Sequence, residues 1–113
     1  MHSKNTNRIG DITELKVCSK LLDEGYEVLR NVGSSGMIDI VVFSPISKTT
    51  HLIDIKTCNP YHKENGEISY CTGYLKDKQI EVNIKIAFLL ENKVFIKDND
   101  EILEFRDYDL KFI

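Results

Sequence analysis

Leu-Ile-Asp-Ile-Lys-Thr-Cys, residues 52–58, has the composition of a buried strand, yet it carries an acid, Asp54, and a base, Lys56. In a strand, side chains at positions i and i+2 point to the same face of the sheet. Asp54 and Lys56 therefore lie side by side, while Ile53 and Ile55 turn toward the other face and can enter a core. Burying the two charges without partners would be costly, so charged or polar partners are expected near this face of the strand.

The remaining chain supplies elements on both sides of this strand. A helix is predicted over residues 8–24 from an apolar stripe at helical spacing, made of Leu15, Val17, Cys18, Leu21 and Leu22. Strands are predicted over 26–30, 38–43, 50–57, 85–91 and 94–97, a polar loop over 59–66 and a second helix over 73–83. The apolar alternation after residue 107 predicts an edge strand or a dimer contact; it consists of Tyr108, Leu110, Phe112 and Ile113. This order predicts a single α/β domain over residues 1–113 with a mixed sheet.

The composition is that of an ordinary globular domain. The chain has 113 residues, of which 42% are hydrophobic and 29% charged, and this size fits one core. The apolar runs are too short for a membrane span and the first residues contain no signal-peptide core, so we expect no membrane partner. Three widely spaced cysteines without a Cys-x-x-Cys motif favour reduced thiols in a cytoplasmic protein, and the histidines show no metal-ligand spacing with them.

The charge is acidic in sum but uneven along the chain. A formal net charge of −3 gives no support to a non-specific nucleic-acid binder, which would be basic. Residues 98–109 are rich in acids, whereas most of the bases come earlier. The earlier bases include Lys16, Lys20, Arg30, Lys48, Lys56, Lys63, Lys76 and Lys78. A local basic surface is compatible with this distribution.

Two further acids occupy unusual positions. Asp39 opens an apolar strand and lies about as far from the Pro45-Ile46 turn as Asp54 does, so the two carboxylates are expected to face each other across neighbouring strands. Glu14 projects inside the apolar arc of the first helix, where a carboxylate needs a partner. Simpler interpretations stay open: Asp39 could cap a turn, Asp54 and Lys56 could form a solvated ion pair, and Glu14 could pair with a nearby lysine, Lys16 or Lys20.

Convergent carboxylates without a His or Cys cluster suit a hard, oxygen-seeking cation such as Mg²⁺ or Mn²⁺. A metal ion held there can lower the pKa of a bound water and stabilise charge on a phosphate, and a nearby ammonium group can assist. The three acids and Lys56 therefore predict, in outline, a site for phosphodiester hydrolysis.

The pattern resembles the PD-(D/E)XK nuclease superfamily over about residues 8–96. The segments that carry the resemblance are Gly10-Asp11-Ile12-Thr13-Glu14, the Leu22-x-x-Gly25-Tyr26-x-Val28-Leu29 stretch, Gly36-x-x-Asp39-Ile40-Val41, and Ile53-Asp54-Ile55-Lys56-Thr57. The first is similar to the opening of intron-associated homing endonucleases. The size and order of elements resemble the small archaeal and phage Holliday junction resolvases.

The resemblance implies an αβββαβ core, like that of restriction endonucleases, and a divalent-metal site. By match of motif, Asp39 and Asp54 would be metal ligands with the carbonyl group of Ile55 as a third, and Lys56 would be the lysine of the motif. Glu14 would be the acid of the first helix and a further candidate ligand. Ile38 replaces the name-giving proline, a substitution that many members carry.

Members often add a polar residue from the second helix, for which Gln79 is the candidate, with a solvated helix position as the alternative. Lys76 and Lys78 could contact phosphates or simply face solvent. On this basis we expect a Mg²⁺-dependent DNA endonuclease that acts as a homodimer, with a preference for branched DNA. A sequence-specific homing or restriction-type endonuclease, and a catalytically idle DNA-binding module on the same fold, are the alternatives.

Overall fold

The computed structural model describes residues 2–33 and 36–113, with side chains for all of these except 2–7, 60–61 and 70–71. Two serines of the predicted turn at 31–36 therefore lie outside the described residues. The elements in chain order are α1 (His2–Asp23), β1 (Glu27–Arg30), β2 (Ile40–Ser44), β3 (Thr49–Ile55), β4 (Asn59–His62), β5 (Ile68–Cys71), α2 (Asp77–Glu81), β6 (Lys85–Leu90), β7 (Lys93–Asp98), β8 (Glu101–Glu104) and α3 (Phe105–Leu110).

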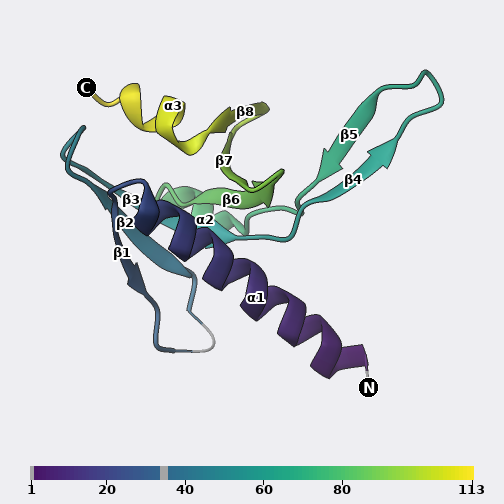
Figure 1. The fold of residues 1–113 in the computed structure, drawn as a ribbon, viewed down its shortest axis with the longest axis horizontal. Coiled ribbons are helices and arrows are strands. Elements are labelled where there is room, and N and C mark those ends of the chain that lie inside the picture. The colour runs from purple at the N-terminus through teal and green to yellow at the C-terminus, as the bar shows by residue number, and fades with distance from the viewer. Residues whose placement is uncertain (1, 34–35) are drawn as a thin grey trace.

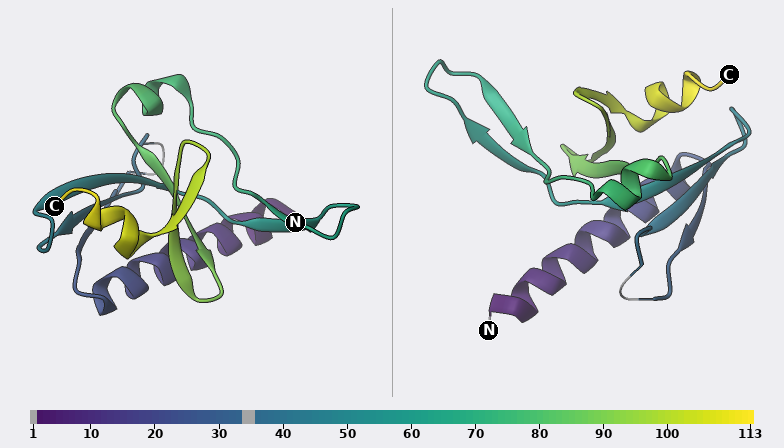
Figure 2. Two further views of the ribbon diagram at one scale, coloured as in Figure 1. Left: turned by 90° about the horizontal axis from the view of Figure 1, so that it is seen from above. Right: turned by 180° about the vertical axis from the view of Figure 1, so that it is seen from behind.

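Six strands form one mixed sheet in the order β1-β2-β3-β6-β7-β8. Neighbours are antiparallel except β3 and β6, which run parallel. A parallel pair needs a long crossover connection, and β4, β5 and α2 supply it. The long helix α1 covers one face of the sheet and the short helix α2 lies on the other (Figures 1 and 2). The prediction of a single α/β domain on a mixed sheet is confirmed.

The main core lies between α1 and the sheet. Val17 and Leu21 of α1 are fully buried against Ile40, Ile53 and Ile96 of the strands. The predicted stripe was too broad, since two of its leucines are half exposed: Leu15 at 52% and Leu22 at 57%. The helix also begins earlier than predicted, and its N-terminal half projects beyond the sheet (Figure 1). A helix meets a sheet along a narrow line, so the outer members of a stripe stay in contact with solvent.

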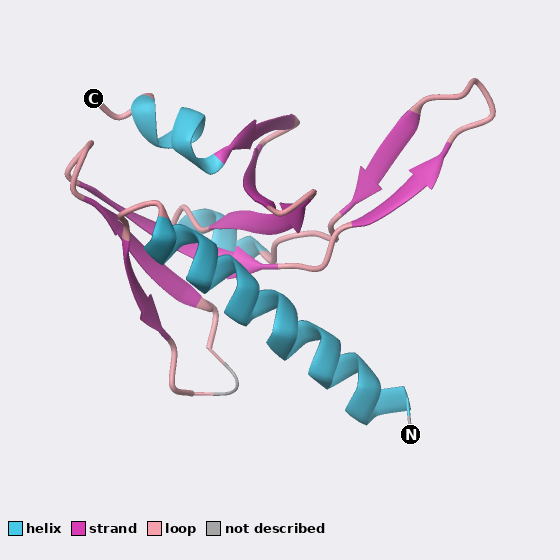
Figure 3. Ribbon diagram, viewed as in Figure 1, coloured by secondary structure: helices cyan, strands magenta, loops and turns pink. Residues whose placement is uncertain are grey.

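A second, two-stranded sheet projects from the body of the molecule (Figure 3). It consists of β4 and β5, where a polar loop was predicted over 59–66. Only the second half of that segment is the hairpin turn, in which Gly66 has a φ of 88° and Lys63 N–H donates to the Glu67 carbonyl oxygen; residues 59–62 form β4. Proline in β4 removes no bond of the main sheet, because this ribbon is separate from it.

The end of the chain was predicted incorrectly. The alternation of apolar residues after 107 falls in and after helix α3, and the edge strand is β8, immediately before it. Phe105 and Tyr108 share one side of α3, three residues apart, and both are buried in the main core. The ring of Phe105 packs edge-on against that of Tyr26, with 4.9 Å between the ring centroids. The helical period of this stripe overrides the apparent alternation. Helix α2 is likewise shorter than the predicted 73–83.

None of the helices in the described part of the chain is long and apolar enough to cross a membrane.

Candidate functional site

Asp39 and Asp54 meet across the β2–β3 pair. Ile40 of β2 is paired with Ile53 of β3 in an antiparallel register, so the next position outward sets Asp39 opposite Asp54. The Asp39 N–H donates to the Ile53 carbonyl oxygen at 2.9 Å, which extends the pairing to this position. The prediction that the two carboxylates face each other is confirmed, and the alternative that Asp39 only caps a turn does not describe its surroundings.

The Asp39 carboxyl group is held in an unusual electrostatic environment. Its Oδ2 accepts a hydrogen bond from the Ile55 N–H at 2.7 Å. Burial, contact with the Asp54 carboxyl and the negative charges of Asp54 and Glu14 together raise the pKa of Asp39 to about 6, against the lowering effect of the Ile55 N–H. Two carboxylates forced together in this way favour either a shared proton or a cation.

Asp54 lacks the hydrogen-bond donors that its burial calls for. The residue is 7% exposed. Its Oδ2 accepts no well-formed hydrogen bond from the described residues. Lys56 Nζ lies 3.3 Å from this oxygen, so the two residues form the ion pair that their spacing predicted. The Lys56 side chain is 38% exposed and that of Asp54 only 10%, so water reaches the pair mainly from the lysine side. A second cation near the Asp54 carboxylate would therefore be favourable.

The main chain of Ile55 contributes to the same place. Its N–H points toward β2, since it donates to Asp39. The N–H and C=O of one residue point to the same side of a strand, so the Ile55 carbonyl group is also directed to the side on which Asp39 lies. This direction fits the predicted role of that carbonyl as a ligand beside the two aspartates.

Glu14 is near the pair but has a partner of its own. Its Oε1 lies 3.2 Å from Arg30 Nη2 and accepts a hydrogen bond from Arg30 Nε at 3.2 Å. The expected partners, Lys16 and Lys20, were the wrong choice, because β1 carries Arg30 alongside α1. The charge of Glu14 still contributes to the raised pKa of Asp39. A direct role for Glu14 at a metal ion stays a prediction.

Gln79 lies beside the acids rather than in solvent. It is buried on α2, where its Nε2 donates to the Met37 carbonyl oxygen and its Oε1 accepts from the Lys76 N–H, both at 2.9 Å. The alternative of a solvated helix position is therefore wrong. Gln79 lines a pocket of about 210 Å³ together with Asp54, Lys56, Tyr74, Lys76, Met37 and Gly36.

The donor set fits a hard divalent cation in part. Two adjacent carboxylates, one with an unsatisfied buried oxygen, and a main-chain carbonyl are oxygen ligands of the kind that Mg²⁺ and Mn²⁺ use. Among the residues that the structure describes, no three His, Cys, Asp or Glu side chains form a group able to hold a metal ion. Mg²⁺ commonly keeps several waters and takes only one or two carboxylates, so this pair is sufficient for it.

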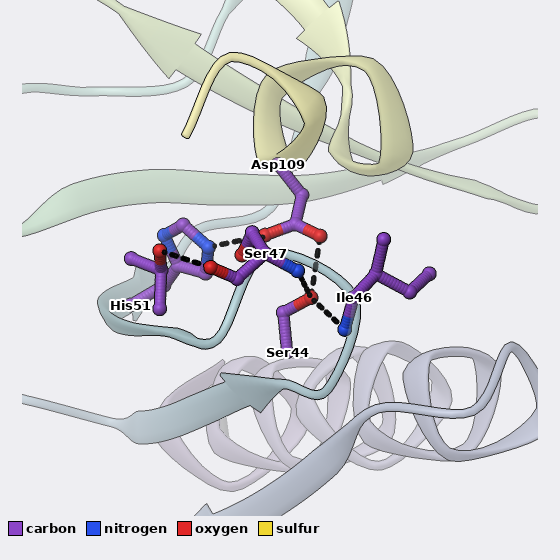
Figure 4. Close-up of polar contacts among 6 residues, drawn as sticks. Ser44, Ile46, Ser47, His51 and Asp109 are labelled. Carbon is purple, nitrogen blue, oxygen red and sulfur yellow. Dashed lines mark hydrogen bonds and ion pairs between the residues drawn. The ribbon is translucent and has the colours of Figure 1, made fainter. Parts of the chain in front are cut away.

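A third buried acid was missed from the sequence. Asp109 of α3 is 1% exposed and accepts hydrogen bonds from Ser44 Oγ at 2.5 Å and Ser47 Oγ at 2.6 Å, while His51 Nε2 lies 2.8 Å from it (Figure 4). Burial alone would raise the pKa of Asp109, but these hydrogen bonds and the interaction with His51 outweigh it and lower the pKa.

This second cluster, Ser44, Ser47, His51 and Asp109, joins α3 to the turn between β2 and β3. Both serines donate to the aspartate and neither bonds to the histidine, so the geometry is not that of a nucleophile and its base. The signal available in the sequence for Asp109 is its place one residue after Tyr108 in the apolar stripe of α3.

No protein-family model, curated protein or solved structure matches this chain.

Proposed function

We propose that this protein is a divalent-metal-dependent DNA endonuclease that hydrolyses phosphodiester bonds, with a fold of the restriction-endonuclease type. The observation that carries the proposal is the pair of facing carboxylates, Asp39 and Asp54, with the pKa of Asp39 raised to about 6 and Lys56 at 3.3 Å from Asp54. An acid pair poised against the ammonium group of a lysine is a form of site in which charge builds up on a transferring phosphate.

The element order supports the same proposal. Helix α1, strands β1, β2 and β3, helix α2 and strand β6 follow one another as an αβββαβ series, with the β4–β5 hairpin inserted and β7, β8 and α3 added. The PD-(D/E)XK superfamily, which the motifs resemble, has an acid at the start of the second strand and an acid–lysine pair on the third; the matching residues here are Asp39, just before β2, Asp54, at the end of β3, and Lys56, just after it.

Each residue has a role in this mechanism. Asp39, Asp54 and the Ile55 carbonyl would hold Mg²⁺ or Mn²⁺, which supplies an activated water and stabilises charge on the phosphate. Above a pH of about 6 the Asp39 carboxyl is ionised and free to serve as a ligand. Lys56 Nζ can orient the attacking water or neutralise the developing negative charge. Gln79 holds the Met37 loop against α2 and so keeps the wall of the pocket in position.

Partners and location follow from the activity. DNA is the proposed substrate, branched DNA in preference to linear duplex, in a cytoplasmic setting. Cutting both strands takes two such sites, which is the reason to propose a homodimer. Of the apolar residues at the C-terminus, Tyr108 is buried within the chain, whereas Leu110, Phe112 and Ile113 are exposed and could contribute to a dimer contact.

A cleavage panel tests the proposal. The protein is incubated with a four-way junction and with a linear duplex of the same sequence, in Mg²⁺, in Mn²⁺ and in EDTA. We expect metal-dependent cutting of the junction, and its absence in EDTA. Preference for the junction separates this reading from a sequence-specific endonuclease. Binding without cutting under every metal condition would favour the idle DNA-binding module instead.

A further inference from the structure

A row of side chains crosses the sheet from the acid pair toward β7. Asp54 of β3 is paired with Ile86 of β6, and Ile86 is paired with Lys97 of β7. Paired residues of adjacent strands point to the same face. Asp54, Ile86 and Lys97 therefore share the face on which α2 lies, and two strand spacings, about 10 Å, separate the backbones at Asp54 and Lys97.

A larger pocket occupies this row beyond the acids. It has a volume of about 420 Å³ and its floor and walls include Ile84, Ile86, Ile80 and Leu75, with Lys97 and Asn83 at polar positions. Tyr74 lines this pocket and also the smaller one beside Asp54 and Lys56. The two pockets are therefore neighbours with one aromatic side chain between them. The volume falls within the range of about 300–1,000 Å³ that small-molecule sites usually have.

Tyr74 is placed as a platform rather than as part of the core. Its side chain is 87% exposed, so it contributes little to burial on folding. Lys97 Nζ lies 5.5 Å from the centroid of its ring, and Lys97 forms no ion pair with the described residues. An exposed aromatic ring with an unpaired ammonium group beside it is a combination that binds single-stranded nucleic acid, by stacking on a base and attracting a phosphate.

We infer that the pocket lined by Tyr74 and Lys97 receives an unpaired base of the DNA substrate, which stacks on the exposed ring of Tyr74 next to the phosphate at Asp54 and Lys56. The inference rests on the proposed function for the identity of the substrate. A base within a duplex has both faces covered by its neighbours in the stack, so only an unpaired base can offer a face to Tyr74. The site therefore selects forks, flaps or other branched DNA in which a base is unpaired beside the cut.

Equilibrium binding in EDTA tests the pocket without any cleavage. Fluorescent oligonucleotides of one length, single-stranded and duplex, are titrated with the parent protein, Tyr74→Ala and Tyr74→Phe. We expect Tyr74→Ala to weaken single-strand binding by about fivefold or more, the loss of one stacked base, and to change duplex binding less than twofold. Tyr74→Phe keeps the ring and should retain parental affinity. Equal losses on both DNAs, or no loss on either, would overturn the inference.

A spectroscopic test reports stacking directly. The chain has no tryptophan, so Tyr74→Trp creates a single fluorophore at the platform. We expect oligothymidine to quench it and an abasic oligomer with the same number of phosphates to leave it unchanged. Leu29→Trp, at an exposed position on β1 at the opposite edge of the sheet, is the matched control and should respond to neither. Equal quenching of Tyr74→Trp by both oligomers would show that the phosphates alone bring the DNA to this position, and it would contradict a base site.

Failure of the two proposals can be told apart. If the protein binds through Tyr74 but never cuts DNA, the base site stands and the endonuclease proposal fails. If it cuts junctions while Tyr74→Ala binds and cuts like the parent, the endonuclease stands and the base site is refuted.

Discussion

The molecule contains two clusters of buried acid, and they are opposites. Asp109 lies at the centre of a complete set of donors from Ser44, Ser47 and His51, and its pKa is lowered. Asp39 faces a second carboxyl group with one N–H donor from Ile55, and its pKa is raised to about 6. The two clusters sit at opposite ends of the same β2–β3 pair, one beside the connecting turn and one where the strands open.

The difference distinguishes an acid suited to a structural role from one suited to the proposed reaction. A carboxylate whose lone pairs are all matched by donors gains stability from its charge and needs nothing further. A carboxylate pressed against another carboxylate costs stability as long as no cation is bound. Function is therefore expected at the end of the hairpin where the polar groups are incompletely satisfied.

The largest expected effect is on cleavage. Asp39→Asn and Asp54→Asn should each reduce the rate of DNA cutting by about a thousandfold or more, because losing a metal ligand removes several kcal/mol of transition-state stabilisation. Initial rates on a junction substrate measure the effect, and circular dichroism verifies the fold. Asp100→Asn, at an exposed acid in the turn between β7 and β8, is the control and should cut like the parent.

The same variants should keep their affinity for DNA or gain some, because each removes a negative charge beside the phosphate. A gel-shift titration in EDTA measures it. Parental cleavage rates in both variants would show that the site has been misplaced, whereas loss of binding in well-folded variants would show that the aspartates act in recognition.

The second effect is on stability and belongs to the other cluster. Asp109→Ala should lower the free energy of unfolding by roughly 3–5 kcal/mol, because it leaves His51 and two serine hydroxyl groups buried without their acceptor. Urea denaturation measures the loss. Cleavage per folded molecule should be unchanged at low temperature; a large fall in that rate with little loss of stability would reverse the assignment of the two clusters.

The third effect is a difference in pH dependence. The native state binds a proton at Asp39 more tightly than the unfolded chain, whose ordinary pKa is 3.8, so the contribution of Asp39 to stability falls as pH rises from about 4 to about 6. In EDTA at pH 7.5, Asp39→Asn should therefore be more stable than the parent by about 1–3 kcal/mol, after allowance for partial exposure, and nearly equal to it at pH 4.

Urea melts of the parent, Asp39→Asn and Asp100→Asn across this pH range make the comparison, and the Asp100 variant should run parallel to the parent. A constant difference between Asp39→Asn and the parent at every pH would mean that Asp39 is not protonated preferentially in the folded state. Saturating Mg²⁺ should stabilise the parent by mass action and have less effect on the variant.

The smallest expected effect on stability concerns Glu14. Its ion pair with the half-exposed Arg30 contributes less than about 1 kcal/mol, so Glu14→Gln should melt close to the parent without metal while losing much of its cleavage rate and part of its stabilisation by Mg²⁺. Arg30→Met is the matched variant, since it removes the pair and retains the acid. Normal rates and an unchanged metal shift in Glu14→Gln would leave Glu14 with a structural role only.

Much of the candidate site could be predicted because it depends on local rules. Strand alternation places Asp54 and Lys56 on one face, and equal distances from the turn between Ser44 and Thr49 set Asp39 opposite Asp54. The partner of Glu14 could not be predicted in this way, because Arg30 is brought to it by the packing of β1 against α1. The burial of Asp109 likewise depends on contacts with residues more than 50 positions away.

The sequence by itself determined the α/β class, five of the six strands of the central sheet and the facing pair of aspartates, since hydrophobic periodicity and a short connection act within one or two elements. Only the tertiary structure decided which acid is fully satisfied and which is not. It also brought Tyr74 beside Lys97 and made the start of the apolar tail part of a helix that buries Phe105 and Tyr108. Those outcomes depend on how separate helices and strands pack against one another, and the hydrophobic period within a single element carries no information about that packing.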